Sequence, residues 1–381
     1  MLKKRDLTQY PLIDTSSNLD KNLVVGIIGD GQLGRMLVLA AARLGVKCRI
    51  YSSNCQGCAI SVADNVIQGC FTDFANLDEF ANGVDVITYE SENISLPAVK
   101  HLSKKYAVYP PAHALEISQD RLAEKKFLKS LDVNVTAFQA VSSEADFLAA
   151  VQRIGTPSIL KTRFLGYDGK GQVELTANSE LSATYSRLSG SPAILEKKVD
   201  FEYEISVILV RGLNSLTSRV YKEKIYDIPA NTHEKGILKR SIVPAPIDDN
   251  IRLEAKAIAC KIANALNYVG ILAVELFVVR CGKQAKLLVN EISPRVHNTG
   301  HWTMDACVVD QFENHIRAIL GWPIGNTDRY VDVEMVNILG SEIYQLQSFL
   351  PQSKSCIHLY GKETVSPLRK MGHINKIKSF S

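Results

Sequence analysis

The sequence predicts an α/β domain followed by an α+β domain, and three observations carry this prediction. A strand–helix–strand pattern with a glycine-rich turn begins at residue 23, a glycine-rich loop with two lysines occupies 161–172, and two apolar strands that carry acidic residues flank residue 283. The chain has 381 residues, 46% of them hydrophobic, which is enough to bury the cores of two or three domains. We therefore expect a parallel-sheet domain, a larger domain with a loop-bearing lid, and a short C-terminal piece.

Charge and cysteine usage exclude several classes of protein. The 44 basic and 40 acidic side chains leave a net charge of +4, which gives no evidence for nucleic-acid binding. The sequence contains no run of 18 apolar residues, so we expect no membrane span. Residues 1–22 are polar, which predicts a flexible extension rather than a secretory signal. Eight scattered cysteines, including a lone Cys55-x-x-Cys58, are typical of reduced thiols. We expect a cytoplasmic protein without membrane or nucleic-acid partners.

The first strand–helix–strand unit points to a phosphate-bearing ligand. The apolar run 23–28 predicts a buried parallel strand, and Gly29-x-Gly31-x-x-Gly34 opens a helix that extends to about Leu44 before a second strand at 46–51. A dinucleotide-binding oxidoreductase would also need an acid after the second strand, where the chain reads Tyr51-Ser52-Ser53-Asn54. The oxidoreductase therefore remains only an alternative.

The next segment supplies acids at a strand end. A strand at 84–89 runs into Glu90-Ser91-Glu92-Asn93, and ligands bind at the carboxyl ends of parallel strands, although a solvated acidic turn would give the same pattern. Pro110-Pro111 and a helix predicted over 118–131 mark the first domain boundary.

Residues 136–195 predict a small α+β lid that carries the glycine-rich loop 166–172. Its three glycines leave backbone amides open to an anion, and Lys161 and Lys170 add positive charge. The loop lacks the Walker A pattern, and a plain hairpin turn could also explain its glycines. The expected elements are strands at 136–141, 158–160, 173–175 and 193–199 and helices at 144–154 and 180–188.

The body of the second domain begins with an alternating strand. Residues 202–210 place Glu202, Glu204 and Ser206 on one face, which predicts a half-buried strand with its carboxylates on the open side. His233, in the turn-rich segment 225–239, is by default an exposed loop histidine, and 250–266 predicts an amphipathic helix.

Two facing acids form the strongest prediction for a site. If the strands 272–279 and 286–292 form a hairpin centred on Lys283, Glu275 lies opposite Glu291 with Cβ atoms about 5 Å apart. Such a pair repels in an apolar setting, and a bridging Mg²⁺ removes the repulsion. A register shift of one residue would instead turn one acid to solvent. With the lysine–glycine loop, the pair predicts a nucleoside triphosphate site, beside a polar loop at 294–303 that could bind an anion and an amine.

Taken together, these motifs resemble the ATP-grasp ligases, and within them the N5-carboxyaminoimidazole ribonucleotide synthetases of purine biosynthesis, over about residues 23–373. The resemblance rests on Gly-x-Gly-Gln-Leu-Gly at 29–34, Tyr-Glu-x-Glu-Asn at 89–93, Gln-Asp-Arg at 119–121, Lys-Thr-Arg-Phe-x-Gly-Tyr-Asp-Gly-Lys-Gly-Gln at 161–172, Asn-Glu-Ile-x-Pro-Arg-x-His-Asn at 290–298 and Arg-Lys-Met-Gly-His at 369–373. It implies a Rossmann-like pre-ATP-grasp domain (23–118), an ATP-grasp domain (119–320) whose lid is about 136–195, and a small C-terminal β-rich domain (321–381).

The resemblance also implies a reaction and its residues. ATP and bicarbonate would give carboxyphosphate, which carboxylates the exocyclic amine of aminoimidazole ribonucleotide in a homodimeric enzyme, with Mg²⁺ (or Mn²⁺) on Glu275 and Glu291. The implied ATP site is Arg121, Lys161, Gly166, Tyr167, Asp168, Gly169, Lys170, Gly171, Gln172, Glu196, Lys197, Lys198, Val199, Glu204, His233, Asn290 and Glu291. The implied ribonucleotide site is Gly31, Gln32, Leu33, Glu90, Tyr167, Arg295, His297, Asn298, Lys362, Arg369 and Lys370. Lys161, Lys170 and Arg295 are the catalytic candidates.

Three departures from the family pattern bear on the ribonucleotide site. Asp30 stands where the family usually has Gly, Tyr51-Ser52-Ser53 replaces a common Leu-Asp-Pro, and Thr364-Val365-Ser366 lacks an Arg that relatives often have. Another ATP-grasp enzyme acting on a different purine-pathway amine therefore remains an alternative. A catalytically dead scaffold is disfavoured because Lys161, Lys170 and both acids are present.

Overall fold

The computed structural model describes residues 22–166, 171–188, 191–212, 222–282, 284–348, 350 and 352–378. All but Asn22 of the predicted extension lies outside these ranges, as do Tyr167, Asp168, Gly169 and Lys170 of the glycine-rich loop. No helix within the described ranges combines the length and the apolar character that crossing a bilayer requires.

The N-terminal region is the predicted parallel sheet, with strand order β3-β2-β1-β4. Its central strand β1 is buried along most of its length, which explains the continuous apolar run in the sequence. The elements are β1 (Val24–Ile28), α1 (Gln32–Arg43), β2 (Lys47–Ser52), η2 (Ile60–Val62), β3 (Asn65–Gln68), α2 (Phe74–Ala81), β4 (Val86–Tyr89) and α3 (Leu96–Leu102).

The helix predicted over 118–131 is α5 (Arg121–Ser130), but its predicted start is wrong, because Ser118 is the last residue of a separate helix, α4 (Ala112–Ser118). The break lies at Gln119 and Asp120. The Asp120 carboxylate accepts a hydrogen bond from the Leu122 amide at 3.0 Å, as an N-cap does. Gln119 donates to the carbonyls of Glu92 and Ile94, so the break attaches the start of α5 to the acidic loop of the first domain.

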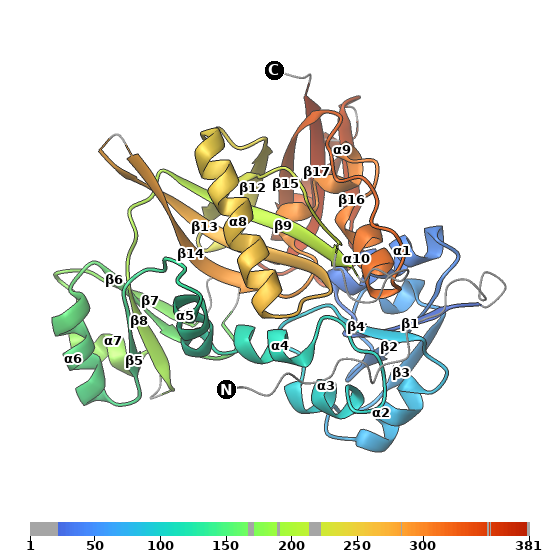
Figure 1. The fold of residues 1–381 in the computed structure, drawn as a ribbon, viewed down its shortest axis with the longest axis horizontal. Helices are drawn as coiled ribbons and strands as arrows, with labels where there is room; N and C mark the ends of the chain where they lie inside the picture. Colours follow the sequence, from blue (N-terminus) through green and yellow to red (C-terminus); the bar gives the residue numbers. More distant parts are fainter. Residues whose placement is uncertain are drawn as a thin grey trace.

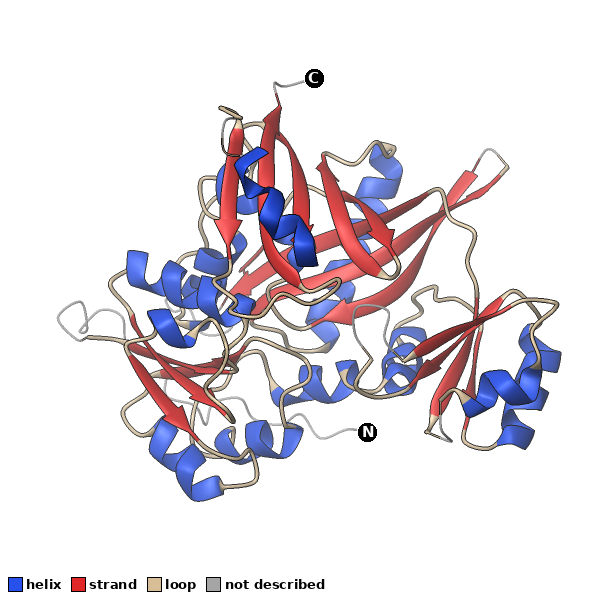
Figure 2. Ribbon diagram, turned by 180° about the vertical axis from the view of Figure 1, so that it is seen from behind, coloured by secondary structure: helices blue, strands red, loops and turns tan. Residues whose placement is uncertain are grey.

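The lid is an antiparallel four-stranded sheet of order β5-β8-β6-β7, and α6 and α7 pack on one of its faces around buried Phe147 (Figure 1). It stands at one end of the molecule, beside the central sheet (Figure 2). Its elements are β5 (Phe138–Val141), α6 (Glu144–Ile154), β6 (Ser158–Thr162), β7 (Gln172–Leu175), α7 (Leu181–Ser186) and β8 (Ala193–Lys197).

A nine-stranded antiparallel sheet forms the body, in the order β14-β13-β9-β11-β12-β15-β17-β16 with β10 on β9. The C-terminal strands β15 and β17 continue the sheet beyond β12, so the β-rich C-terminal part shares it. The strands are β9 (Tyr203–Gly212), β10 (Lys222–Ile225), β11 (Ala230–Glu234), β12 (Ile237–Val243), β13 (Gly270–Cys281), β14 (Gln284–Ser293), β15 (Asp332–Leu339), β16 (Ser355–Leu359) and β17 (Lys370–Lys378). The helices are α8 (Asp249–Ala265), η3 (Asn298–Gly300), α9 (Thr303–Ala306), α10 (Gln311–Ile319) and η4 (Gly340–Ser348).

The prediction that β9 is half-buried and open on its acidic side is wrong. Its odd-numbered residues, such as Ile205 and Val207, join the apolar core under α8, while Ile208 and Val210 on the other face join the core that includes α10. Glu204 and Ser206 are therefore also buried. Polar residues in a strand covered on both faces are not solvated, and here they belong to a site.

The packing of α8 predicts a contrast between two of its side chains. Ile262 is fully buried in the core under the sheet, whereas Leu253 is 66% exposed. Ile262→Ala should lower the free energy of unfolding by about 2–5 kcal/mol, because it leaves a cavity. The matched control Leu253→Ala should change it by less than about 0.5 kcal/mol. Chemical denaturation measures both, and equal effects would show that α8 packs through another face.

Candidate functional site

Glu275 of β13 and Glu291 of β14 are direct register partners, so their side chains leave the same face of the sheet. Glu275 is 5% exposed. Burial, and next the negative charge of Glu291, raise the pKa of Glu275 above its usual range. The predicted pairing of the two acids is thus confirmed.

The predicted centre of the hairpin is nevertheless wrong. Cys281 pairs with Gln284 and Leu276 pairs with Val289, a register that would place Asn290 opposite Glu275 if it continued. A β-bulge between Glu275 and Leu276 adds one residue on β14 and brings Glu291 to that position instead. Without the bulge Glu291 would turn to the other face, because side chains alternate along a strand.

Arg121, at the start of α5, joins the acids to the glycine-rich loop. Its guanidinium donates to Glu291 at 3.0 Å and to the Gly166 carbonyl at 3.4 Å, and its backbone amide donates to the Arg163 carbonyl. Arg163 in turn forms an ion pair with Asp120. Although burial opposes the shift, the charges of Arg121 and Lys161 lower the pKa of Glu291. The base of the loop therefore lies beside the acidic pair.

On the lid, Lys161 of β6 donates to Glu196 of β8 at 3.0 Å, and both side chains are buried. Despite that burial, the charges of Lys125 and Lys161 lower the pKa of Glu196 to about 2. The second carboxylate oxygen of Glu196 is buried and has no hydrogen-bond partner among the described residues. Gln172, where the loop re-enters the sheet, pairs with Lys161.

The three residues that follow Glu196 in the predicted ATP site have side chains with other surroundings. Lys197 donates to the Thr156 carbonyl and Lys198 forms an ion pair with Glu174 at 2.6 Å, so both bind within the lid. Val199 is half-buried beyond the end of β8. Their side chains do not join the acidic pair.

The default reading of His233 as an exposed loop histidine is wrong, because His233 lies in β11 and forms an ion pair with Glu204 of β9 at 2.9 Å. Although burial opposes the shift, Glu204 raises the pKa of His233. Glu204 and Glu275 also interact electrostatically. Charged side chains therefore follow one another across neighbouring strands, from Glu291 of β14 and Glu275 of β13 to Glu204 of β9 and His233 of β11.

The loop after β14 brings the ribonucleotide candidates to the same place. His297 lies 3.5 Å from the Glu275 carboxylate, and burial lowers the pKa of His297 well below its ordinary value, so its imidazole is neutral. Arg295 forms a two-pronged ion pair with Glu92 of the first domain. Asn298 is buried, and its amide exchanges two hydrogen bonds with Asn337 of β15.

Glu90 fills the position that a phosphate would take in a dinucleotide-binding turn. Its carboxylate accepts hydrogen bonds from the amides of Gly31 and Gly34 at 2.5 and 2.7 Å, at the start of α1. A Cβ atom on Gly29 or Gly31 would lie 2.5 or 2.7 Å from this side chain, so the glycines admit the acid. Leu33 is buried behind them, and Gln32 is half-buried. This arrangement excludes a pyrophosphate from the turn and argues against the oxidoreductase alternative.

Two of the three departures from the family pattern, Asp30 and the segment 51–53, are joined by a hydrogen bond. Ser52 donates to the Asp30 carboxylate at 2.6 Å, and the same oxygen accepts from the Gly57 amide at 2.9 Å. Asp30 therefore braces the segment 52–59, which contains Cys55 and Cys58.

The C-terminal basic residues differ in their surroundings. Burial, and next the charge of Arg369, lower the pKa of Lys362 to about 8. Arg369 donates back to the Thr364 carbonyl at 2.8 Å, within the segment that departs from the family pattern. Lys370 interacts electrostatically with Glu92, Glu275 and His297, so it lies between the acids of the first domain and the facing pair.

The acidic pair fits a magnesium ion that substrate phosphates help to hold. No group of three or more His, Cys, Asp or Glu side chains in the described part of the chain could hold a metal alone. Mg²⁺ commonly binds one or two protein carboxylates together with phosphate oxygens. Two facing acids, Glu275 buried and Glu291 about one-third exposed, repel each other in isolation and supply that donor set.

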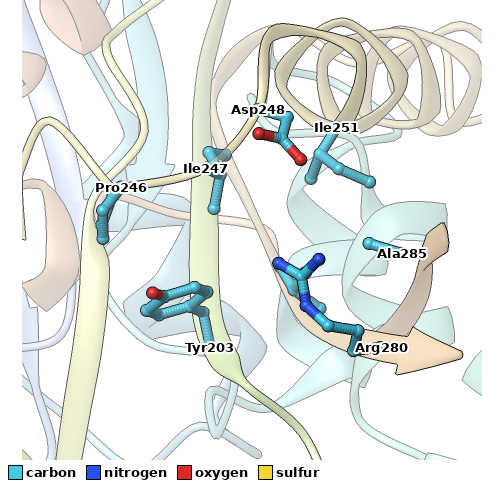
Figure 3. A pocket seen from close by; sticks show the side chains of 8 residues that line it. Tyr203, Pro246, Ile247, Asp248, Ile251, Arg280 and Ala285 are labelled. Atoms are coloured by element: carbon cyan, nitrogen blue, oxygen red, sulfur yellow. The ribbon is translucent and has the colours of Figure 1, made fainter. Parts of the chain in front are cut away.

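A small pocket lies on the other side of the sheet (Figure 3). It has a volume of about 20 Å³ and is lined by residues that include Tyr203, Ile251 and Val278. Tyr203 and Val278 alternate with Glu204 and Phe277, so they face α8 rather than the acids. The pocket is also smaller than typical ligand sites of roughly 300–1,000 Å³. It is not part of the candidate site.

Sequence reasoning assigned no role to three charged residues: Glu124 and Lys125, which are buried, and Glu92, which is half-buried. Glu92 belongs to a quoted motif, but its contact with Arg295 joins segments about two hundred residues apart. Glu124 and Lys125 contact β14 from α5: Glu124 accepts from the Ile292 amide at 2.7 Å, and Lys125 donates to the Asn290 carbonyl at 2.6 Å. One signal was present, since Lys125 shares a helix face with the apolar Leu122 and Leu128.

Comparisons with known proteins agree with this architecture. Family models match as the ribonucleotide synthetase preATP-grasp domain (23–119), the ATP-grasp domain (126–312) and the phosphoribosylaminoimidazole carboxylase C-terminal domain (334–380). The N5-carboxyaminoimidazole ribonucleotide synthase of Brucella melitensis is 43% identical over 364 residues, covering 95% of this chain and 98% of that protein.

Solved structures agree as well. The Staphylococcus aureus N5-carboxyaminoimidazole synthetase complexed with ADP has a TM-score of 0.87 and 35% identity, covering 93% of both chains. The Aspergillus clavatus N5-carboxyaminoimidazole synthase in complex with ADP and 5-aminoimidazole ribonucleotide has a TM-score of 0.84 and 26% identity, covering 94% of this chain and 95% of that one. The predicted fold class is confirmed, and the chain belongs to the N5-carboxyaminoimidazole ribonucleotide synthase family of ATP-grasp enzymes.

Proposed function

We propose that the chain is an ATP-dependent ligase that carboxylates 5-aminoimidazole ribonucleotide with bicarbonate, forming N5-carboxyaminoimidazole ribonucleotide in purine biosynthesis. The observation that carries the proposal is the contact of Arg121 with both Glu291 and Gly166, beside Glu275. This arrangement would put a loop that binds phosphate beside a pair of acids that binds a metal ion, and a nucleoside triphosphate with Mg²⁺ needs both. Membership in the family, with relatives solved in complex with ADP and with the ribonucleotide, supports the same reaction.

The nucleotide end of the site would use the lid and the body together. Lys161, Lys170 and Arg121 would supply positive charge for the phosphates. The Glu196 oxygen that has no hydrogen-bond partner among the described residues could accept a hydrogen bond from the nucleotide. Glu275 and Glu291 would hold Mg²⁺ (Mn²⁺ has similar ligand preferences), together with phosphate oxygens. When bound, the ion neutralises charge that develops on the phosphates during transfer.

The chemistry would proceed in two transfers. A bicarbonate oxygen attacks the γ-phosphorus of ATP, the bond to the β-phosphate oxygen breaks, and ADP leaves with formation of carboxyphosphate. Carboxyphosphate then breaks down to phosphate and CO₂. The exocyclic amine attacks the CO₂ carbon and loses a proton. His297 lies beside Glu275, and Arg295, which is paired with Glu92, interacts electrostatically with His297. These two side chains would bind the anion and the amine, while burial would keep water from the labile intermediate.

The ribonucleotide end would lie between the first domain and the C-terminal strands. Glu90, held by the glycine turn, and Lys362, Arg369 and Lys370 surround this region, and Lys362 and Lys370 offer charge for the ribose phosphate. A homodimer in the cytoplasm is what the family resemblance favours for the assembly and the compartment.

The proposal is tested by ADP release from ATP, Mg²⁺ and bicarbonate, with and without aminoimidazole ribonucleotide. We expect the ribonucleotide to stimulate ADP release strongly, because it accepts the carboxyl group and so consumes the carboxyphosphate that forms together with ADP. A matched reaction with another purine-pathway amine should give no stimulation. Equal ADP release in all reactions would refute the proposed acceptor.

Glu291→Gln should lower the rate of ADP formation by at least about 100-fold, because it removes a negative charge from the acid pair and changes the side-chain shape little. The thermal unfolding midpoint should stay near that of the wild type. The control Glu254→Gln changes an exposed acid of α8 and should leave the rate unchanged. Turnover retained in Glu291→Gln would show that the metal lies elsewhere.

Ribonucleotide binding should weaken as the pH rises through the pKa of Lys362. That pKa is about 8 in the ligand-free protein, so Lys362 is charged at pH 7 and mostly neutral at pH 9. If only the charged form binds the phosphate, the Kd for the ribonucleotide should rise about tenfold between these pH values. Calorimetric titration measures it. In Lys362→Arg the rise should vanish, since Arg stays charged; an unchanged rise would assign it to another group.

A further inference from the structure

The first turns of α5 contact three consecutive residues of β14. Arg121 donates to the Glu291 carboxylate, Glu124 accepts from the Ile292 amide at 2.7 Å, and Lys125 donates to the Asn290 carbonyl at 2.6 Å. The helix positions are spaced by three and four residues, so all three side chains leave the same face of α5. These contacts surround the bulge that turns Glu291 toward Glu275.

A bulge leaves a backbone group without its ladder partner. A buried carbonyl in that situation needs another donor, or its burial destabilises the local conformation. Lys125 is 1% exposed and donates to the carbonyl of Asn290, the residue that the bulge adds. The lysine thus stabilises the bulged register over the regular one.

Lys125 also faces the lid. Its ammonium lies 3.7 Å from the Glu196 carboxylate, which binds Lys161 at 3.0 Å. One buried cation is therefore shared between the body strand that carries Glu291 and the lid strand that carries Glu196. Neither contact touches the ligand directly, so Lys125 acts through other residues.

We propose that Lys125 and Glu124 are positioning residues, an inference that rests on the proposed nucleotide site. Together they hold the bulge at Asn290. They thereby keep the Glu291 side chain directed toward Glu275, on the face of the sheet where the metal and the phosphates would bind. The competing explanation is that the pair only satisfies buried polar groups and stabilises the fold. If the two residues position Glu291, their loss should weaken the effect of Mg²⁺ on nucleotide affinity. If they only stabilise the fold, that effect should stay unchanged.

The test measures the Kd for ADP by calorimetry with and without Mg²⁺ on the full chain, and compares the ratio of the two values. In Lys125→Met the gain in affinity from Mg²⁺ should shrink by at least about tenfold, the size expected for loss of one charge-assisted hydrogen bond. The matched control Lys126→Met changes the exposed neighbour on the same helix and should keep the wild-type ratio. Ribonucleotide affinity, measured without nucleotide, should stay within about twofold of the wild type in both variants.

Glu124 supplies a second pair of variants that keeps the test decisive if Lys125→Met does not fold. Glu124→Gln retains an oxygen acceptor for the Ile292 amide and should keep the wild-type Mg²⁺ effect, whereas Glu124→Leu removes the acceptor and should lose it. A lower unfolding midpoint with an unchanged Mg²⁺ effect in Lys125→Met and Glu124→Leu would overturn the inference. Failure of the wild-type protein to bind Mg²⁺–ADP would instead refute the proposed nucleotide site, and the inference with it.

Discussion

The site depends on one extra residue in one strand. The β13–β14 hairpin alone would set Glu275 opposite Asn290, and the bulge replaces that pair with two facing acids, of which Glu275 is buried and Glu291 half-buried. Facing carboxylates in an apolar core destabilise each other by charge repulsion and by loss of solvation. The surrounding cations Arg121, Lys125 and Lys161 offset part of this cost and bias the negative charge toward Glu291 and Glu196. In the function proposed above, a bound divalent cation would offset the repulsion that remains between the two acids.

The same arrangement explains why residues from three parts of the chain meet at this place. The body sheet supplies the acids, α5 links them to the lid loop through Arg121 and Lys125, and the first domain reaches the loop after β14 through Glu92 and Arg295. Each link is a buried or half-buried ion pair or hydrogen bond, so each fixes direction as well as distance. Such links are what ordered transfer between two substrates requires, since small displacements slow it strongly.

The sequence predicted much of the fold because most strands and helices show clear periodicity, as α8 and the apolar β1 do. It also predicted the pairing of Glu275 with Glu291, but from a symmetric hairpin centred on Lys283, which the bulge replaces. A bulge has no reliable signature in local propensity. His233, Glu92, Glu124 and Lys125 could not be assigned from the residues alone, because their roles come from partners far away in the chain. The break between α4 and α5 could have been read from Asp120, which is a strong N-cap residue.

The glycine turn shows how a motif can persist while its ligand changes. In a dinucleotide-binding protein the amides at the start of such a helix bind a pyrophosphate, and the glycines make room for it. Here the amides of Gly31 and Gly34 bind the carboxylate of Glu90, and a Cβ atom at Gly29 or Gly31 would collide with that side chain. The anion position is thus filled by the protein itself, at the end of β4. A ligand at this edge meets a fixed acid instead of open amides, which favours hydroxyl and amine donors over phosphate. In the proposed function, phosphate recognition would therefore fall to Lys362, which precedes β17, and Lys370, which begins it.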